Sequence, residues 1–131
     1  MVEGDAENIL VPVIAEILGY PLEKYGVSIV NVGSTAFLRY SRIMLRSDGT
    51  TVPTPVSIIT DCDVKPYEKD NEEMVFPDKS EEYAEAIKKK MERYDIGTIK
   101  SYVSPKWTLE YCLALSCLGD DFHKAIHYGK K

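Results

Sequence analysis

The amino-acid sequence predicts an α/β fold in which helices flank a four-stranded parallel sheet. Short runs of apolar, mostly β-branched residues alternate with segments in which apolar residues recur at helical spacing. This alternation occurs four times in 131 residues, and the chain contains no internal repeat. Parallel strands need a crossover connection, which is usually a helix, so the alternation favours a parallel sheet. The length suits a single domain over residues 1–131.

The first strand and helix are expected within residues 1–19. Met1 and Val2 are typical of the end of a strand, and a turn glycine follows two residues later. Because strands usually have about five residues, we expect this domain to be excised from a larger protein. Pro12 predicts either a helix that begins near Ile9 or an early kink, and Gly19 is expected to end the helix. The apolar residues of this helix share one face: Ile9, Leu10, Val13, Ile14, Ile17 and Leu18.

The middle of the chain is expected to hold two strands with a helix between them. Val27–Val32 and Val56–Thr60 are short, apolar and rich in β-branched residues, which is typical of buried strands. Between them, Ser34 or Thr35 is suited to cap a helix over residues 36–46. A Ser-Asp-Gly sequence at 47–49 is expected to end that helix.

The last part of the chain is expected to contain a long loop, two helices and the fourth strand. Residues 65–79 are polar and acidic and contain two prolines, which is typical of a loop or insertion. A helix follows from Ser80 to about Arg93, and its lysine run at 88–90 favours a solvated helix end, with phosphate contact as the alternative. The strand Thr98–Val103 precedes one helix from Thr108, with Cys112 and Cys117 on its core side.

Charge and composition exclude several classes of protein. The chain has 16 Lys and Arg against 21 Asp and Glu, a net charge of −5, whereas a passive DNA-binding sleeve is usually basic. No apolar run approaches the roughly 18 residues of a membrane span, and the N-terminus does not resemble a signal peptide. The 3 cysteines lack metal-binding spacing. We therefore expect a cytoplasmic protein with free thiols and no membrane partner.

Acidic residues follow the predicted strands, where the functional sites of parallel sheets lie. Glu3 follows the first strand, and Asp61 and Asp63 follow the third. In an extended segment the side chains of residues i and i+2 point the same way, so these two carboxylates would stand side by side. That arrangement is costly unless a cation intervenes, and Mg²⁺ prefers a few carboxylates plus water. Glu7, one helical turn beyond Glu3, could serve a second ion about 4 Å away.

The second predicted strand ends in Gly33-Ser34-Thr35. The glycine lets the chain turn sharply, and the amides of Ser34 and Thr35 could receive a phosphate at a helix N-terminus. A simple helix cap is the competing interpretation.

The combination of these segments resembles the Toprim domain shared by topoisomerases, bacterial primases and several nucleases. It is more similar still to the Toprim domain of the OLD (overcoming lysogenization defect) family of ATP-dependent endonucleases. The segments that carry the resemblance are Glu3-Gly4-Asp5-Ala6-Glu7, Asn31-Val32-Gly33-Ser34-Thr35-Ala36-Phe37, Ile59-Thr60-Asp61-Cys62-Asp63 and Trp107-Thr108-Leu109-Glu110-Tyr111.

The resemblance implies a Rossmann-like Toprim fold and a Mg²⁺- or Mn²⁺-dependent nuclease that nicks or cleaves DNA. Glu3, Asp61 and Asp63 match the family's catalytic and metal-binding carboxylates, and Glu7 matches a glutamate associated with a second metal ion. Glu110 matches a family position whose role is open between a helix-end charge and a metal contact. Family members also use a basic residue beyond this stretch to stabilise the transition state; Lys130 or Lys131 could stand near that position, and the alternative is that this chain ends before it.

Two features depart from the family pattern. The second strand end usually reads Gly-Gly in the family, whereas this chain has Gly33-Ser34, so we expect the serine side chain to narrow the phosphate approach there. An OLD protein also carries an ABC-type ATPase domain ahead of its Toprim domain, and this chain has no phosphate-binding Gly-x-x-x-x-Gly-Lys-[Ser/Thr] loop. The resemblance therefore implies that ATP acts only through that other domain, and that the parent protein is a homo-oligomer.

The expected partner is DNA, contacted through its backbone. Arg39, Arg42, Lys65 and Lys106 are the candidates for these contacts, which position a strand without reading its sequence. Trp107 could stack on a base, although packing under the last helix is the favoured interpretation.

Three alternatives remain at this stage. A Toprim module that binds DNA or protein without catalysis is one, and an RNA-processing Toprim nuclease is another. A haloacid-dehalogenase-type phosphatase also places Asp-x-Asp after a strand, but it requires Thr or Val where this chain has Lys65, and it uses the first strand.

The two histidines, His123 and His127, are four residues apart near the C-terminus. On a helix they would share a face and could bind zinc, but the sequence shows no third ligand nearby, and histidines are common at helix ends.

Overall fold

The computed structural model describes residues 1–45, 48, 50, 52–70 and 73–129. The chain forms two compact units. The first consists of Met1–Thr60 and Lys90–Tyr102, and the second of Asp61–Lys89 and Val103–Lys131. No helix in the described ranges combines the length and the apolar character that crossing a lipid bilayer requires.

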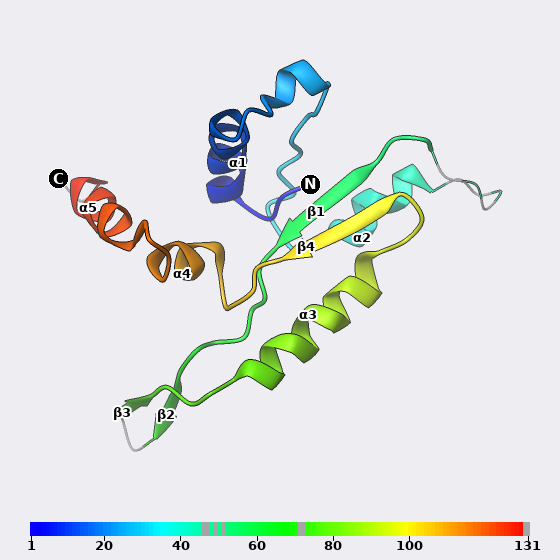
Figure 1. Cartoon of the computed structure of the whole chain (residues 1–131). Coiled ribbons are helices and arrows are strands. Elements are labelled where there is room, and N and C mark those ends of the chain that lie inside the picture. Colours follow the sequence, from blue (N-terminus) through cyan, green and yellow to red (C-terminus); the bar gives the residue numbers. More distant parts are fainter. Residues whose placement is uncertain (46–47, 49, 51, 71–72, 130–131) are drawn as a thin grey trace. The chain divides into compact units, whose positions relative to one another are not determined.

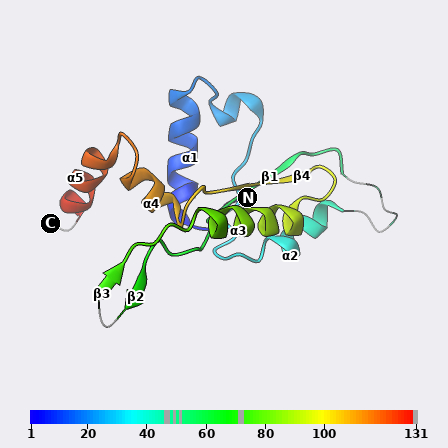
Figure 2. The same cartoon turned by 60° about the horizontal axis from the view of Figure 1, so that its bottom comes forward.

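The sheet of the first unit is built on two neighbouring strands, β1 (Val56–Thr60) and β4 (Ile99–Val103). Figures 1 and 2 show them side by side and pointing the same way. Val2 adds single-residue parallel bridges to Ile59 of β1 on one side and to Asn31 on the other. Four segments of backbone therefore run in parallel, but only two are strands among the described residues, so the prediction of a four-stranded sheet was wrong.

Val2 pairs with the segment at 27–32 through two backbone hydrogen bonds. Its N–H donates to the Val30 carbonyl at 2.9 Å, and its carbonyl accepts from the Val32 N–H at 3.0 Å. A strand needs repeated pairing, and the predicted strand Val27–Val32 is reduced to one bridge at Asn31.

The core of the first unit lies on one face of this sheet. Val56, Ile58 and Ile99 from the strands are buried against Phe37 and Tyr94. The two aromatic rings meet edge-on, with centroids 5.6 Å apart and an interplanar angle of 83°. Such pairs contribute about 0.5–1.5 kcal/mol beyond the burial of their area. The alternating burial along β1 shows a strand with one covered face, rather than one buried on both sides.

Helix α1 (Asp5–Ile17) begins earlier than Pro12 suggested and holds that proline in its interior. Gly4 is its N-cap residue, and the helix ends in a Schellman motif around Gly19, whose φ is +83°. In this motif the N–H of Tyr20 donates to the carbonyl of Ala15 at 2.8 Å, and that of Gly19 to Glu16 at 2.9 Å. The predicted role of Gly19 as the helix stop is confirmed.

The apolar face of α1 is exposed, although its sequence pattern is that of a core-facing helix. Ile9, Val13 and Ile17 are 65%, 50% and 78% exposed, and the only buried residue of the helix is Glu7. Amphipathic spacing shows which side of a helix is apolar, but the contacts that cover that side depend on the rest of the fold.

The segment after the second predicted strand is less helical than expected. Its helical part is divided into α2 (Phe37–Ser41) and the 3₁₀ turn η2 (Arg42–Met44). Elsewhere, another 3₁₀ turn, η1 (Leu22–Tyr25), follows α1. The expected end of this helix at residues 46, 47 and 49 lies outside the described residues.

In the second unit, the predicted loop 65–79 contains a small hairpin. Strands β2 (Glu68–Asp70) and β3 (Glu73–Val75) pair antiparallel, and all six residues are exposed. Exposed strands of three residues have no apolar alternation, so the polar sequence resembled a loop.

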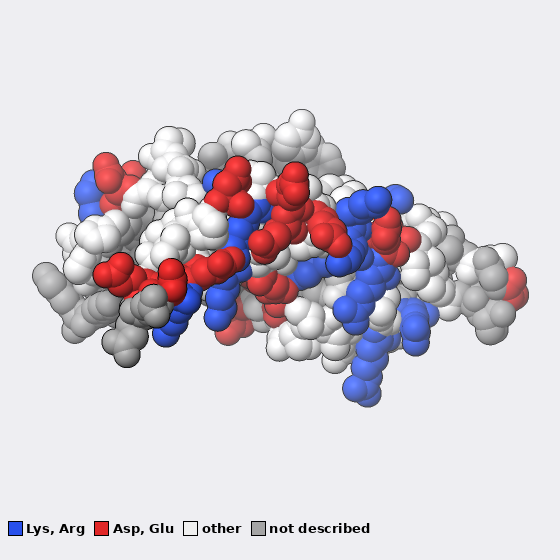
Figure 3. Space-filling view, turned by 90° about the horizontal axis from the view of Figure 1, so that it is seen from below, with Lys and Arg blue, Asp and Glu red and all other residues white. Residues whose placement is uncertain are grey.

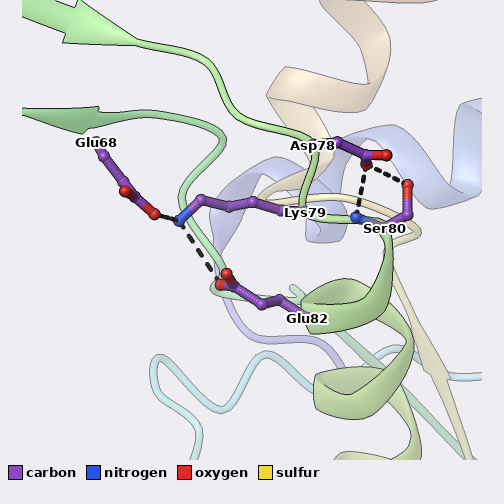
Figure 4. A network of polar contacts seen from close by, with 5 residues as sticks. All are labelled: Glu68, Asp78, Lys79, Ser80 and Glu82. Carbon is purple, nitrogen blue, oxygen red and sulfur yellow. Dashed lines mark hydrogen bonds and ion pairs between the residues drawn. The ribbon is translucent and has the colours of Figure 1, made fainter.

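Helix α3 (Ser80–Tyr94) confirms the predicted third helix and begins in the polar network of Figure 4. Asp78 accepts hydrogen bonds from the N–H and the hydroxyl of Ser80, at 3.0 and 2.6 Å. The Lys79 ammonium, on a side chain only 9% exposed, contacts Glu68 of β2 at 2.7 Å and Glu82 of α3 at 3.6 Å. The hydrogen bond with Glu68 is the main reason why the pKa of Lys79 is raised. The network ties the hairpin to the first turn of α3.

The last predicted helix is divided into α4 (Leu109–Ala114) and α5 (Gly119–Gly129). Thr108 caps α4 by accepting from the Tyr111 N–H at 3.2 Å, whereas the Ser116 hydroxyl bonds back to Leu113 and interrupts the helix. Cys117 lies in this break and is exposed, so its predicted core position was wrong; Cys112 is half-buried and Cys62 is buried.

Candidate metal centre

The carboxylate of Glu3 is held at the end of the sheet in the first unit. The Thr60 hydroxyl, at the last position of β1, donates to Oε2 of Glu3 at 2.8 Å. Thr60 is 2% exposed, and the neighbouring bridge between Val2 and Ile59 fixes the two backbones. A buried hydroxyl donor restricts the rotamer of the carboxylate, which is how outer-shell residues orient metal ligands.

A second polar contact links the first helix to the bridge residue of the neighbouring segment. The Asn31 side-chain amide donates to Oδ1 of Asp5 at 2.7 Å, and its oxygen accepts from the Gly33 N–H at 2.9 Å. Gly33 has a φ of +66°, which a residue with a side chain adopts only with strain. Sequence analysis named Asn31 and Thr60 only as parts of the matching segments and assigned them no role, because neither side chain carries a charge.

Ser34 is exposed, and its hydroxyl oxygen accepts from the Ala36 N–H at 3.3 Å. This local bond is the one expected of a turn or cap. The N-cap residue of α2 is Ala36, so the prediction that Ser34 or Thr35 caps this helix was wrong.

Glu7 is 5% exposed and caps the helix on which it stands. Its Oε2 accepts from the N–H of Gly4 at 3.0 Å, which is the side-chain half of a capping box. The bond satisfies one of the backbone donors that the first turn of a helix leaves unpaired. Glu7 thus has a structural role at the N-terminus of α1.

In the second unit, the segment after β1 is hydrogen-bonded to the segment that precedes α4. Oδ1 of Asp61 accepts from the Leu109 N–H at 2.8 Å, and the Asp63 N–H donates to the Trp107 carbonyl at 2.9 Å. Between them, the Cys62 N–H donates to the Ser104 hydroxyl oxygen at 2.8 Å. Asp61 and Asp63 are thereby held by backbone groups far along the chain.

Asp63 has a φ of +67°, in the left-handed region. Aspartate tolerates this conformation better than most residues, at a cost of about 1–2 kcal/mol. Since β1 ends at Thr60, the two aspartates do not continue the strand, and the expectation that an extended backbone points both side chains the same way does not hold. A left-handed residue within a candidate ligand set is the kind of strain found at functional sites.

The structure supplies oxygen donors of the type that Mg²⁺ and Mn²⁺ prefer, and it orients two of them through Thr60 and the Leu109 N–H. Among the described residues, no three His, Cys, Asp or Glu side chains form a group able to hold a metal ion. The residue types therefore fit a hard divalent cation. In the described geometry, however, the carboxylates are each held by their own hydrogen bonds and do not form one group.

The remaining sequence candidates lie on the surface. Glu110 is exposed in the first turn of α4, where a negative charge interacts favourably with the helix dipole. The four basic candidates for DNA contact are also exposed: Arg39, Arg42, Lys65 and Lys106. The terminal lysines at 130 and 131 lie outside the described residues.

Charges on α3 are segregated along the helix. Glu81 and Glu82 stand in its first turn and Arg93 in its last. On the face drawn in Figure 3, acidic and basic side chains lie interspersed.

Trp107 belongs to an aromatic cluster of the second unit. Its ring lies 5.8 Å from that of Tyr67 and 5.8 Å from that of Tyr111 in α4, and Tyr67 in turn meets Phe76 at 6.3 Å. The half-buried indole thus packs against the helix that follows it.

Comparison with known proteins finds a similarity, which covers residues 1–63. Residues 1–63 match the family model described as "Overcoming lysogenization defect protein-like, TOPRIM domain". The match includes Glu3, Glu7, Asp61 and Asp63, and it confirms the resemblance seen in the sequence over these residues. No curated protein and no solved structure matches the chain.

Proposed function

We propose that the chain is the catalytic domain of a metal-dependent DNA endonuclease, on the premise that residues 1–63 match a Toprim domain of the overcoming lysogenization defect type. The observation that carries the proposal is that the family match includes carboxylates that stand next to the end of a strand. Glu3, Asp61 and Asp63 all fall in the matched stretch, and Glu3 is anchored to the end of β1 by Thr60. Sites in parallel sheets gather at such ends.

In this proposal Glu3, Asp61 and Asp63 supply the ligands of a Mg²⁺ or Mn²⁺ ion. A bound divalent cation stabilises charge on a phosphodiester undergoing hydrolysis and lowers the pKa of a coordinated water. The Thr60 hydroxyl keeps the Glu3 carboxylate oriented, and the Leu109 N–H does the same for Asp61.

Glu7 is the proposed ligand for a second ion. It already accepts a hydrogen bond from the Gly4 N–H, so a metal would have to share this carboxylate with the helix cap. The two-metal arrangement consequently predicts that Glu7 both stabilises α1 and supports activity.

DNA is the proposed substrate, bound through its phosphates. The exposed side chains of Arg39, Arg42, Lys65 and Lys106 are the proposed contacts, so we expect weak sequence preference and strong dependence on salt. We further propose that an ATPase domain of a homo-oligomeric, cytoplasmic parent protein is the partner through which ATP acts.

The test is nicking of supercoiled plasmid in Mn²⁺, with EDTA as the first control. Glu3→Gln and Asp61→Asn are the informative variants, because each keeps an oxygen that can accept the bond from Thr60 or Leu109 while removing the negative charge. Glu73→Gln, at an exposed position of β3, is the matched control.

We expect both charge-removing variants to lose nicking and Glu73→Gln to retain it. Nicking that persists in Asp61→Asn would contradict the ligand assignment. If wild-type protein in Mn²⁺ does not cut plasmid but cuts a structured RNA, the alternative of an RNA-processing Toprim nuclease replaces the DNA enzyme.

A binding-only module is the second candidate function, and one observation favours it. The described residues contain no ready group of three metal ligands. Such a module would bind DNA equally well with EDTA or Mn²⁺, and its affinity would be unchanged in Asp61→Asn. A catalytic domain instead requires the metal for its reaction, so the binding and nicking assays together distinguish the two.

A further inference from the structure

Helix α5 carries two histidines whose ring nitrogens face each other. His123 and His127 are four residues apart, and their Nε2 atoms are 3.2 Å from one another. The ring centroids are 4.6 Å apart and the planes are inclined by 77°. Both side chains are exposed on the same side of α5, and with Lys124 and Tyr128 they line a surface hollow.

This distance is the one that a shared metal ion imposes on two imidazole ligands. With Zn–N bonds of about 2.0–2.1 Å, two nitrogens lie about 2.9 Å apart at a right angle and about 3.4 Å apart at the tetrahedral angle. The observed 3.2 Å between the Nε2 atoms falls between these limits. The separation of the two Nε2 atoms is therefore that of two ligands of one ion.

The competing interpretation is a hydrogen bond between the two rings. It requires one Nε2 to be protonated and the other to accept, and both rings are exposed to water that offers equivalent bonds. The net contribution of such an exposed bond is small. The two nitrogens thus remain available to a stronger ligand.

We propose that His123 and His127 form a binding site for a borderline transition-metal ion such as Zn²⁺, Ni²⁺ or Cu²⁺. Imidazole suits these ions, whereas Mg²⁺ prefers oxygen ligands, so the site is chemically distinct from the carboxylates of the proposed nuclease centre. Among the described residues no third His, Cys, Asp or Glu joins the pair. The site is consequently open and exchangeable, with its other positions held by water or by a donor from another molecule.

The charge next to the site is compatible with a bound cation. Lys124 is the nearest basic residue along the helix, and its ammonium is paired with the Asp121 carboxylate at 3.1 Å. Asp120 and Asp121 in the first turn add negative charge to the same helix.

The test is Zn²⁺ stoichiometry of the full chain by equilibrium dialysis, together with retention of the untagged chain on immobilised Ni²⁺. His123→Ala and His127→Ala each remove one ligand, and Tyr128→Phe is a control in the same hollow. A double variant, His127→Ala with Tyr128→His, keeps two histidines but separates them by five residues. That spacing rotates the second ring by about 140° around the helix and abolishes chelation.

We expect one Zn²⁺ per wild-type chain and retention on Ni²⁺, both preserved in Tyr128→Phe. Affinity should fall at least tenfold in both alanine variants and in the relocated pair, since loss of mere outer-shell partners costs about 10–100-fold. Binding that is unchanged in the relocated pair would overturn the proposal, because it would place the metal elsewhere. Wild-type protein that binds no Zn²⁺ would also overturn it.

Discussion

Removing the carboxylate of Asp95 should destabilise the first unit by an amount that depends on what replaces it. Oδ1 of Asp95 accepts from the N–H and the hydroxyl of Ser101, at 2.7 and 2.6 Å. Ser101 lies on β4 and is 5% exposed, so its donors have little access to water. Asp95 directly follows α3, and these bonds therefore join the end of that helix to the sheet.

The magnitude follows from the type of bond. Hydrogen bonds to an ionised group contribute about 1.5–3 kcal/mol, and a buried donor left without a partner costs about 1–3 kcal/mol. Because both bonds share one oxygen and are not additive, we expect Asp95→Ala to lower the free energy of unfolding by about 2–4 kcal/mol. Asp95→Asn retains an acceptor oxygen, and the loss should be about 1 kcal/mol.

The effect should also depend on pH. Hydrogen bonding from Ser101 holds the pKa of Asp95 below its ordinary value. The stabilisation is therefore fully present above the pKa of an unfolded aspartate, about 3.9, and is lost as pH falls through the lower pKa of the folded state. The difference between wild type and Asp95→Ala should shrink over that acidic range.

Urea unfolding of wild type, Asp95→Ala and Asp95→Asn at pH 7 measures these values, with Ser101→Ala completing a double-mutant cycle. The reasoning is refuted if Asp95→Ala unfolds within about 0.5 kcal/mol of wild type, or if Asn costs as much as Ala, since neither result fits a carboxylate that satisfies buried donors.

Three further predictions concern the helices and the thiols. Glu7→Ala should lower the free energy of unfolding by about 1 kcal/mol through loss of the α1 cap. Glu7→Gln keeps an acceptor for the Gly4 N–H and should lose less. Urea unfolding would contradict this if both variants behaved alike. Gly119→Ala would place a Cβ 2.5 Å from the last carbonyl oxygen of α4 and should lower the free energy of unfolding by about 1–3 kcal/mol. Gly129→Ala, with nothing within 4 Å of the added Cβ, should be nearly neutral. Equal unfolding midpoints for the two variants would show that the α4–α5 contact is not tight. Cys117 is exposed and Cys62 buried, so a thiol reagent should modify Cys117 first in the native protein, and mass mapping that finds Cys62 first would be incompatible with this structure.

Local patterns in the sequence were sufficient for several elements and for the residue types of the site. The predicted strand Val56–Thr60 and the helix from Ser80 were confirmed because their periodicity, caps and charges all agreed. Gly19 ended α1 as expected. The Toprim resemblance was confirmed over residues 1–63, since its signature consists of short segments that keep their chemistry wherever the chain folds.

Other features depended on contacts between distant residues. The hairpin in 65–79 has a weak sequence pattern because it depends on the pairing of two strands. The break between α4 and α5 has an equally weak pattern because it depends on a serine that bonds back to its own helix. The exposed apolar face of α1 is a further case, because an apolar sequence pattern does not determine which part of the fold covers it.

The candidate site also has features set by the sequence and features set by the tertiary structure. The sequence alone determined that carboxylates follow the strands, because residue type and order are local properties. Only the tertiary structure decided that Thr60 orients Glu3, that the Leu109 N–H orients Asp61, and that Asp63 adopts a left-handed backbone. The bonds to Glu3 and Asp61 join residues 57 and 48 positions apart, and a hydrogen bond across such a separation forms only where folding brings both ends together.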